Sequence, residues 1–164
     1  MNMFGRDYAV GGIALVLVLS ACGGASNPNR ALVERFYEEG FNQGNVAVID
    51  VIFAADFNNH SLSAGPSWAS GRGLYRREIA AFRDAFPDLR ITVADWILDG
   101  DRVVACVTWT GTHLGDLPGA PGSGNRFEAS GIYIYRISDG KIVESWSEFD
   151  RAGFLRQLGV TEEQ

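Results

Sequence analysis

The chain has 164 residues and a formal net charge of −6, from 14 Lys and Arg against 20 Asp and Glu. Its 46 % apolar and 21 % charged residues are ordinary for one globular domain and exclude a disordered or wholly membrane-embedded chain. The negative charge argues against nucleic-acid binding, which needs clustered basic residues. Two cysteines make no disulfide framework, and two histidines without a zinc-type spacing argue against a metal site. No cofactor motif is present.

The N-terminus has the pattern of a secretion signal. An uncharged run over residues 8–21 follows Arg6. As a helix it would span about 21 Å, which is shorter than a hydrocarbon core of ~30 Å. The run ends in LSAC, at residues 19–22, which resembles the lipobox of bacterial lipoproteins. This resemblance implies cleavage before Cys22 and acylation of its thiol. Plain secretion with a chance cysteine is the alternative.

These features predict three segments: a lipoprotein signal peptide over residues 1–21, a tether over 22–28 and a folded domain over 29–160. We expect lipid such as palmitate on Cys22 to hold the domain on the membrane of a bacterial cell envelope, outside the cytoplasm. Cys106 then remains alone, and a single cysteine within an apolar run is most often a small core residue.

Helical periodicity dominates the first half of the domain. A first helix is expected to be capped by Asn27 or Asn29 and to end at residues 42–44, and a short second helix is expected to start near Asn45. Residues 56–61 are a candidate short strand. A third helix is predicted over residues 73–86, and its apolar side chains recur at helical spacing: Tyr75, Ile79, Phe82 and Phe86.

The second half changes to a strand pattern. Four segments are rich in β-branched and aromatic residues, over residues 89–98, 102–113, 126–137 and 141–150. Asp-Gly turns after the first and third segments indicate antiparallel hairpins. Residues 115–124 contain four Gly and two Pro, which predicts a mobile loop that could act as a lid. A last helix is expected over residues 151–158, with Asp150 as its cap.

This order of elements predicts an α+β domain in which helices cover one face of a strongly curved antiparallel sheet and leave a cone-shaped cavity. Alternation places Trp109 and His113 on the inward face of their strand. In the next strand, Gly131, Tyr133 and Tyr135 share one face. In the last strand, neither face is purely apolar, so periodicity alone does not assign the inward side.

The domain resembles the SnoaL-like polyketide cyclase (ester cyclase) family, of nuclear-transport-factor-2-like fold, over about residues 29–159. The resemblance rests on these segments: LVERFY (32–37), NQGN (42–45), DFNNH (56–60), AFRDAFPDL (81–89), GTH (111–113), IYRI (134–137), DGKIVE (139–144) and LRQLG (155–159). It implies a cone-shaped barrel in which a strongly curved antiparallel sheet wraps around three helices.

The resemblance also implies an acid–base aspartate on the last strand, where this chain has Ser147 after Trp146. It further implies that Tyr133 stands where some cyclases carry a pocket imidazole. The alternating sets 131/133/135 and 143/145/147 are then expected to line the pocket. A serine hydroxyl does not replace a carboxylate base, and losing a positioned base typically costs 10²–10⁴-fold in rate. The exchange at Ser147 therefore argues against cyclase activity by the family route.

Three residues are catalytic candidates: His113, His60 and Ser147, the last as the position of the family aspartate. A histidine suits proton transfer because its pKa lies near 6.5, although a rim histidine satisfied by loop backbone is the structural alternative. Tyr133 could donate a hydrogen bond to an oxyanion. The predicted ligand-binding residues are Trp109, Tyr133, Gly131, Ser145 and Tyr37.

Three functions follow from this pattern. The first is a lipid-anchored SnoaL-like domain whose apolar cavity binds a small hydrophobic or aromatic ligand. The second is an isomerase, dehydratase or hydrolase on the same fold that uses His113 and His60. The third is a non-enzymatic protein-interaction module. By analogy with related folds, a homodimer through the convex sheet face is also expected.

Overall fold

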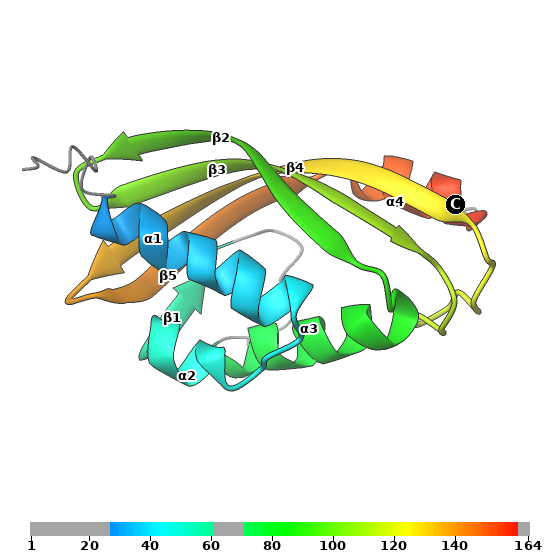
Figure 1. Cartoon of the computed structure of the whole chain (residues 1–164), viewed down its shortest axis with the longest axis horizontal. Coiled ribbons are helices and arrows are strands. Elements are labelled where there is room, and N and C mark those ends of the chain that lie inside the picture. The colour runs from blue at the N-terminus through cyan, green and yellow to red at the C-terminus, as the bar shows by residue number, and fades with distance from the viewer. Residues whose placement is uncertain (1–26, 61–70, 161–164) are drawn as a thin grey trace, which may run out of the picture.

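The computed structural model describes residues 27–60 and 71–160, so the predicted signal peptide, Cys22 and most of the tether lie outside the described residues. The elements, in chain order, are α1 (Pro28–Arg35), η1 (Phe36–Asn42), α2 (Val48–Ile52), β1 (Phe53–Asn59), α3 (Gly73–Ala85), β2 (Arg90–Asp99), β3 (Arg102–Thr112), β4 (Arg126–Ser138), β5 (Lys141–Phe149) and α4 (Arg151–Leu158). Helices α1, α2 and α3 lie together on one side of the curved sheet (Figure 1). The predicted α+β class is confirmed.

The sheet is mixed rather than purely antiparallel. Its strand order is β1-β5-β4-β3-β2, and the three pairings among β2, β3, β4 and β5 are antiparallel as expected. Strand β1 pairs with β5 in parallel, with Asn59 opposite Ser145. A parallel neighbour cannot be joined by a hairpin, and here α3 and three strands separate the two partners along the chain. The short strand also begins earlier than predicted, at Phe53.

The first helix changes geometry midway. Asn27 caps α1 as expected, because its side chain accepts the backbone N–H groups of Asn29 and Arg30. The chain then continues from Phe36 as a π-helix, where the sequence predicted one uninterrupted helix. The wider turn buries Phe36, Tyr37, Gly40 and Phe41 together. At its end, the Asn42 side chain binds both backbone groups of Ile91, which fixes the helix against β2.

Alternation along the strands sets the concave face. In β3 and β4, every second residue is buried, which confirms the inward sets that contain Trp109 and Tyr133. Strand β5 contains a bulge, where the pairing shifts between Arg136 and Ile137. Because a bulge reverses the alternation, Ile142 is fully buried in place of Val143. The expectation that Val143 lines the pocket is wrong for this reason.

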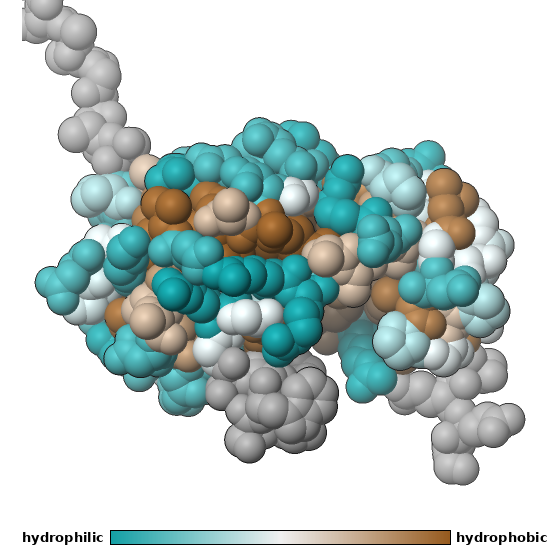
Figure 2. Space-filling view, turned by 90° about the horizontal axis from the view of Figure 1, so that it is seen from below, coloured by the Kyte–Doolittle hydropathy of each residue, from teal (hydrophilic) through white to brown (hydrophobic). Residues whose placement is uncertain are grey.

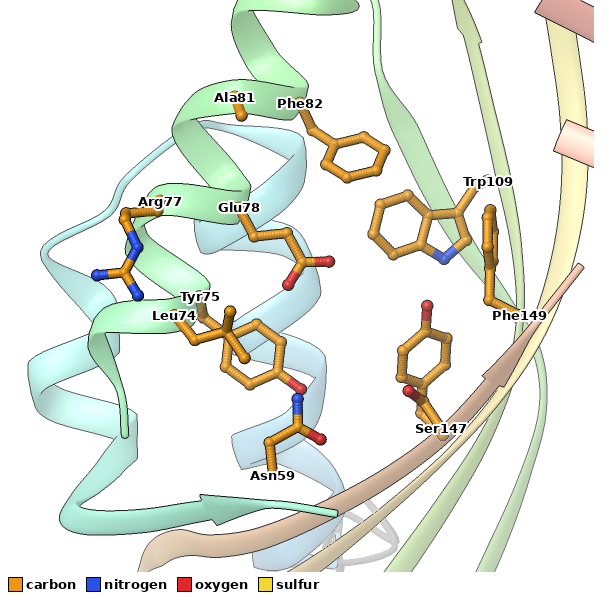
Figure 3. Close-up of a pocket in the computed structure, with 11 residues that line it drawn as sticks. Asn59, Leu74, Tyr75, Arg77, Glu78, Ala81, Phe82, Trp109, Ser147 and Phe149 are labelled. Carbon is orange, nitrogen blue, oxygen red and sulfur yellow. The ribbon is translucent and has the colours of Figure 1, made fainter. Parts of the chain in front are cut away.

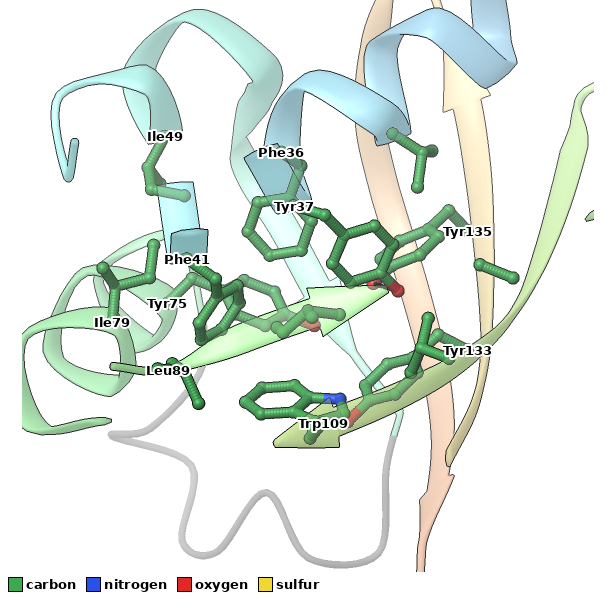
Figure 4. Close-up of a cluster of buried hydrophobic side chains, with 14 of the residues drawn as sticks. Phe36, Tyr37, Phe41, Ile49, Tyr75, Ile79, Leu89, Trp109, Tyr133 and Tyr135 are labelled. Atoms are coloured by element: carbon green, nitrogen blue, oxygen red, sulfur yellow. Dashed lines mark hydrogen bonds between the residues drawn. The ribbon is translucent and has the colours of Figure 1, made fainter. Parts of the chain in front are cut away.

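Aromatic rings fill part of the space that the sequence predicted to be an open cone (Figure 4). Phe36 lies at their centre, with ring centroids 4.9 Å from Phe53, 5.0 Å from Tyr75 and 6.0 Å from Tyr135. The hydroxyl groups of Tyr37 and Tyr135 lie 2.8 Å apart and are buried. This cluster closes the interior beside η1 and leaves the space near Trp109 and Tyr133 for a pocket.

The surface is mixed in character. In the view from below, mostly hydrophilic residues surround a hydrophobic band (Figure 2). Exposed large apolar side chains include Ile97 and Leu98 on β2 and Ile132 on β4. Within residues 27–60 and 71–160, no helix combines the length and the apolar character needed to cross a membrane.

Candidate functional site

A pocket of about 360 Å³ lies between α3 and the concave face of the sheet (Figure 3). Its described lining residues come from α3 and from strands β1, β3, β4 and β5: Asn59, Leu74, Tyr75, Arg77, Glu78, Ala81, Phe82, Trp109, Tyr133, Ser147 and Phe149. Its volume falls at the lower end of the range for small-molecule sites. Apolar walls with a few polar groups are typical of such sites.

Packed rings hold Trp109 in the sheet wall of this pocket. The indole is 2 % exposed. Its ring centroid lies 4.9 Å from that of Phe41, 5.2 Å from Phe82 and 5.8 Å from Phe149. The Tyr133 ring stacks on the indole at a centroid distance of 6.3 Å, with an angle of 26° between the ring planes. Contacts from η1, α3, β4 and β5 therefore leave the indole little freedom to reorient, and this wall of the pocket is preformed.

Glu78 is the acidic group of the pocket. It is the one carboxylate among the described lining residues, and it is half-buried. No hydrogen bond or ion pair joins it to another described residue. Its carboxylate points from α3 toward Trp109, whereas the Arg77 side chain points away (Figure 3). Burial raises the pKa of Glu78 from 4.5 to about 7, because desolvation disfavours the charged form.

Two hydrogen-bond donors belong to the opposite wall. The indole Nε1 of Trp109 is buried and makes no well-formed hydrogen bond with a described residue, although it lies near the Tyr133 hydroxyl. A buried donor without a partner is costly, and a bound ligand could satisfy it. Burial raises the pKa of the Tyr133 hydroxyl, and a weak hydrogen bond from the Trp109 indole N–H offsets that rise only in part. Tyr133 therefore stays protonated at neutral pH and can donate.

A second polar group lies beside Tyr75. The Tyr75 hydroxyl is 3.2 Å from Oγ of Ser145, and that Oγ donates to Oδ1 of Asn59 at 3.3 Å. Ser145 is completely buried, so these contacts satisfy a hydroxyl that would otherwise destabilise the core. Burial is also the main cause of the raised pKa of Tyr75. The group connects α3 to β1 and β5 along one side of the pocket.

The predicted ligand-binding residues divide into two groups. Trp109, Tyr133 and also Ser147 line the pocket. The remaining three lie next to it: Ser145 beneath Tyr75, Tyr37 in contact with Tyr133 at a ring distance of 6.3 Å, and Gly131 beside Tyr133. A Cβ at Gly131 would come within 2.8 Å of the Tyr133 ring, so this glycine makes room for that ring.

His113 lies outside the lining of the pocket. It is fully buried, and its ring stacks on Phe86 at a centroid distance of 5.2 Å. Nδ1 is 3.2 Å from Oγ of Ser123, while Nε2 has no partner among the described residues. The inward position was predicted correctly. Phe86 and the segment that follows β3 enclose the ring, so it does not face the space beside Trp109 and Glu78.

His60 lies against side chains of β5 that do not line the pocket. Its ring stacks on Trp146 at 4.6 Å, and Nε2 is 3.8 Å from a carboxylate oxygen of Glu144. Trp146 and Glu144 alternate with Ser145 and Ser147 along β5, so they project from the opposite face of the sheet. The structure therefore does not bring His60 and His113 together at the pocket. Their catalytic roles stay predictions without support from this geometry.

Sequence reasoning missed Glu78, although a signal for it was present. Glu78 lies three residues after Tyr75 and four before Phe82, and residues with these spacings share one face of a helix. The third helix thus carries a carboxylate within its apolar stripe. A charged residue at such a position is rarely buried without a reason, which makes it a candidate for a functional group.

The fold and the site define a small α+β protein in which helices and a concave sheet enclose a pocket lined mainly by aromatic side chains. A family model described as SnoaL-like polyketide cyclase matches residues 31–158. The chain belongs to this family. Within the described residues, no group of three or more histidine, cysteine or acidic side chains could hold a metal ion.

Curated relatives include three cyclases. The aklanonic acid methyl ester cyclase of Streptomyces peucetius is 41 % identical over 61 residues, which cover 37 % of this chain and 42 % of the relative. The chain therefore matches less than half the length of that protein, and the same holds for its counterpart from Streptomyces sp. strain C5, at 38 %. The nogalonic acid methyl ester cyclase of Streptomyces nogalater is 29 % identical over 126 residues, covering 73 % of this chain and 89 % of the relative.

Solved structures agree with this assignment. TsrD from Streptomyces laurentii superposes with a TM-score of 0.73 at 29 % identity, covering 82 % of this chain and 96 % of that one. IdmH, a putative polyketide cyclase from Streptomyces antibioticus, gives a TM-score of 0.70 at 29 % identity, covering 82 % of this chain and all of that one. The nuclear-transport-factor-2-like architecture expected from the sequence is thus shared with these solved structures.

Proposed function

We propose that this protein binds a flat, mainly aromatic molecule carrying carbonyl groups, of the polyketide type, in the pocket between α3 and the sheet. One observation carries this proposal: the walls are aromatic, but a buried indole N–H without a well-formed hydrogen bond and a protonated tyrosine hydroxyl belong to one side. The rings suit an aromatic ligand, and the donors suit its carbonyl oxygens. The methyl ester cyclases among the relatives support this ligand class.

Adjacent residues of β5 allow a matched test of this proposal. Ser147→Phe would place a ring inside the pocket, whereas Glu148→Phe would place the same ring on the opposite face of the strand, where Glu148 is exposed. We expect tryptophan fluorescence titrations with nogalonic acid methyl ester to show saturable binding for the natural protein and for Glu148→Phe, but not for Ser147→Phe. Equal affinity of the two variants would exclude this pocket as the binding site.

The membrane anchor is a separate part of the proposal. It rests on the sequence LSAC at residues 19–22, and it places the domain at the surface of a bacterial membrane. In cells expressing the full chain, Cys22→Ala should move the protein from the membrane fraction to the soluble fraction, and Cys106→Ala should not. Unchanged membrane fractionation of Cys22→Ala would refute acylation.

A further inference from the structure

We propose that Glu78 is the acid–base residue of the pocket and that it removes a proton from a carbon next to a carbonyl group of the bound molecule. This inference rests on the ligand class proposed above. It assigns the chemistry to helix α3 rather than to Ser147 on β5 or to either histidine.

The position of Glu78 is the first support. Among the described lining residues, it alone can act as a carboxylate base, and none of them forms a salt bridge or hydrogen bond with it. An ion pair would lower the pKa of the Glu78 carboxyl group and hold its oxygens in one position. Without one, the carboxylate is available to a ligand, and Figure 3 shows it projecting into the space in front of the Trp109 indole.

The relation between Glu78 and the two donors is the second support. Glu78 projects from the helix wall, whereas Trp109 and Tyr133 belong to strands β3 and β4 of the sheet wall. A flat molecule between these walls can present a C–H bond to the carboxylate and a carbonyl oxygen to the indole N–H and the tyrosine hydroxyl. Proton abstraction next to a carbonyl needs this combination of a base and a donor to the developing oxyanion.

The proposed step balances without a cofactor. The Glu78 carboxylate takes the proton as the C–H bond breaks, and the electron pair moves into the carbonyl group to give an enolate, whose oxygen accepts hydrogen bonds from Trp109 and Tyr133. The enolate carbon can then form a bond to a second carbonyl carbon of the same molecule. Protonated Glu78 returns its proton to the resulting alkoxide. Nothing is oxidised or reduced, and the product is an isomer of the substrate.

The electrostatic surroundings suit this role. The titratable groups that face Glu78 are Tyr75 on its own helix, Tyr133 on β4 and Tyr37 on η1, and burial keeps each of them neutral. The neighbouring cation, Arg77, is exposed and points away. Burial therefore sets the pKa of Glu78 near neutrality, so both the base and its conjugate acid are populated at physiological pH.

The test measures exchange of hydrogen for deuterium at the carbon next to the carbonyl group of the bound molecule. Full-length protein is incubated with nogalonic acid methyl ester in deuterium oxide, and deuterium incorporation and ring closure are followed by mass spectrometry. We expect Glu78→Gln to slow the protein-dependent exchange by about 10²–10⁴-fold. The dissociation constant, from fluorescence titration, should change less than about threefold. Glu78→Asp should recover part of the rate, and Glu148→Gln on the outer face of β5 should match the natural protein.

The outcomes separate this inference from the proposed function. Binding accompanied by exchange that requires Glu78 supports both. Binding with no exchange, or with exchange unaffected by Glu78→Gln, overturns the role of Glu78 and leaves the ligand class intact. Absence of saturable binding overturns the proposed function and, with it, this inference. The pH profile gives a further check, because the rate should rise as the pH passes through about 7 and Glu78→Gln should lose that step.

Discussion

The hydroxyl groups of Tyr37 and Tyr135 lie 2.8 Å apart in the interior, although 98 positions separate the two residues along the chain. One belongs to η1 and the other to the concave face of β4. Their contact joins the helical layer to the sheet beside Tyr133, whose ring is 6.3 Å from Tyr37 and 6.4 Å from Tyr135. The pair therefore supports one wall of the pocket while remaining outside its lining.

Removing one hydroxyl of this pair should cost more than removing both. Tyr37→Phe leaves the buried Tyr135 hydroxyl without its partner, at an expected cost of about 1–3 kcal/mol in the free energy of unfolding. The double variant Tyr37→Phe/Tyr135→Phe removes the second polar group too and should recover part of that loss. Urea unfolding of the four proteins in the double-mutant cycle measures this. Simple additivity of the two single effects would show that the hydroxyls do not interact.

Glu78 should make stability depend on pH in an unusual direction for a carboxyl group. Between pH 4.5 and about 7, the folded state retains a proton that the unfolded state has lost, so the free energy of unfolding falls as the pH rises. Glu78→Gln has no such proton. The variant should match the natural protein near pH 4 and exceed its stability by on the order of 3 kcal/mol at pH 8.

Urea unfolding of both proteins at pH 4, 6 and 8 checks this prediction. Contributions of other groups, such as Asp88, whose pKa is lowered chiefly by its bond to the Thr112 hydroxyl, cancel in the difference between the two proteins. A difference that stays constant with pH would show that Glu78 titrates normally in the folded protein. If Glu78→Gln is the more stable protein at pH 8, as expected, the natural carboxylate lowers stability, which is typical of a residue retained for function.

Local patterns predicted most of the strand layer and the last helix. Alternation assigned the inward faces of β3 and β4, and Asp150 caps α4 through the N–H of Gly153 as expected. The parallel pairing of β1 with β5 could not be predicted from local patterns, because the paired residues are 86–89 positions apart in the chain. The bulge that turns Ile142 inward in place of Val143 could not be predicted either, because both faces of β5 are partly polar and the alternation does not mark the inward side.

The candidate site was predicted from the strand side alone. Trp109, Tyr133 and Ser147 follow from inward alternation together with the family resemblance, and all three line the pocket. Glu78 was missed because a search for the apolar stripe of a helix passes over its charged members. His60 and His113 were candidates because imidazole suits proton transfer, but a residue type does not show where in the fold the side chain lies. Only packing shows that β5 separates His60 from the pocket and that Phe86 covers His113.

Gly115 should tolerate no side chain. A Cβ there would lie 2.4 Å from the carbonyl oxygen of Asp84, because residues 114 and 115 both donate their N–H groups to Ala85 at the end of α3. We expect Gly115→Ala to destabilise the protein by about 1–3 kcal/mol and to lower its melting temperature. Gly73→Ala is the control, since its Cβ would meet nothing nearer than the Arg77 guanidinium at 3.5 Å. Equal melting temperatures would show that the loop moves away at no cost.

His113 should matter to stability more than to ligand binding. Its buried ring packs on Phe86, and the Ser123 N–H donates to Nδ1, so His113→Ala removes both an aromatic contact and an acceptor. A cost of about 2–4 kcal/mol is expected, whereas the affinity for nogalonic acid methyl ester should change little, because His113 does not line the pocket. His60→Ala is the matched comparison, because that half-exposed ring stacks on Trp146 and its loss should cost less than about 1 kcal/mol. Thermal unfolding and fluorescence titration of both variants distinguish the two roles. Lost affinity or lost exchange in a stably folded His113→Ala protein would extend the site to the end of β3.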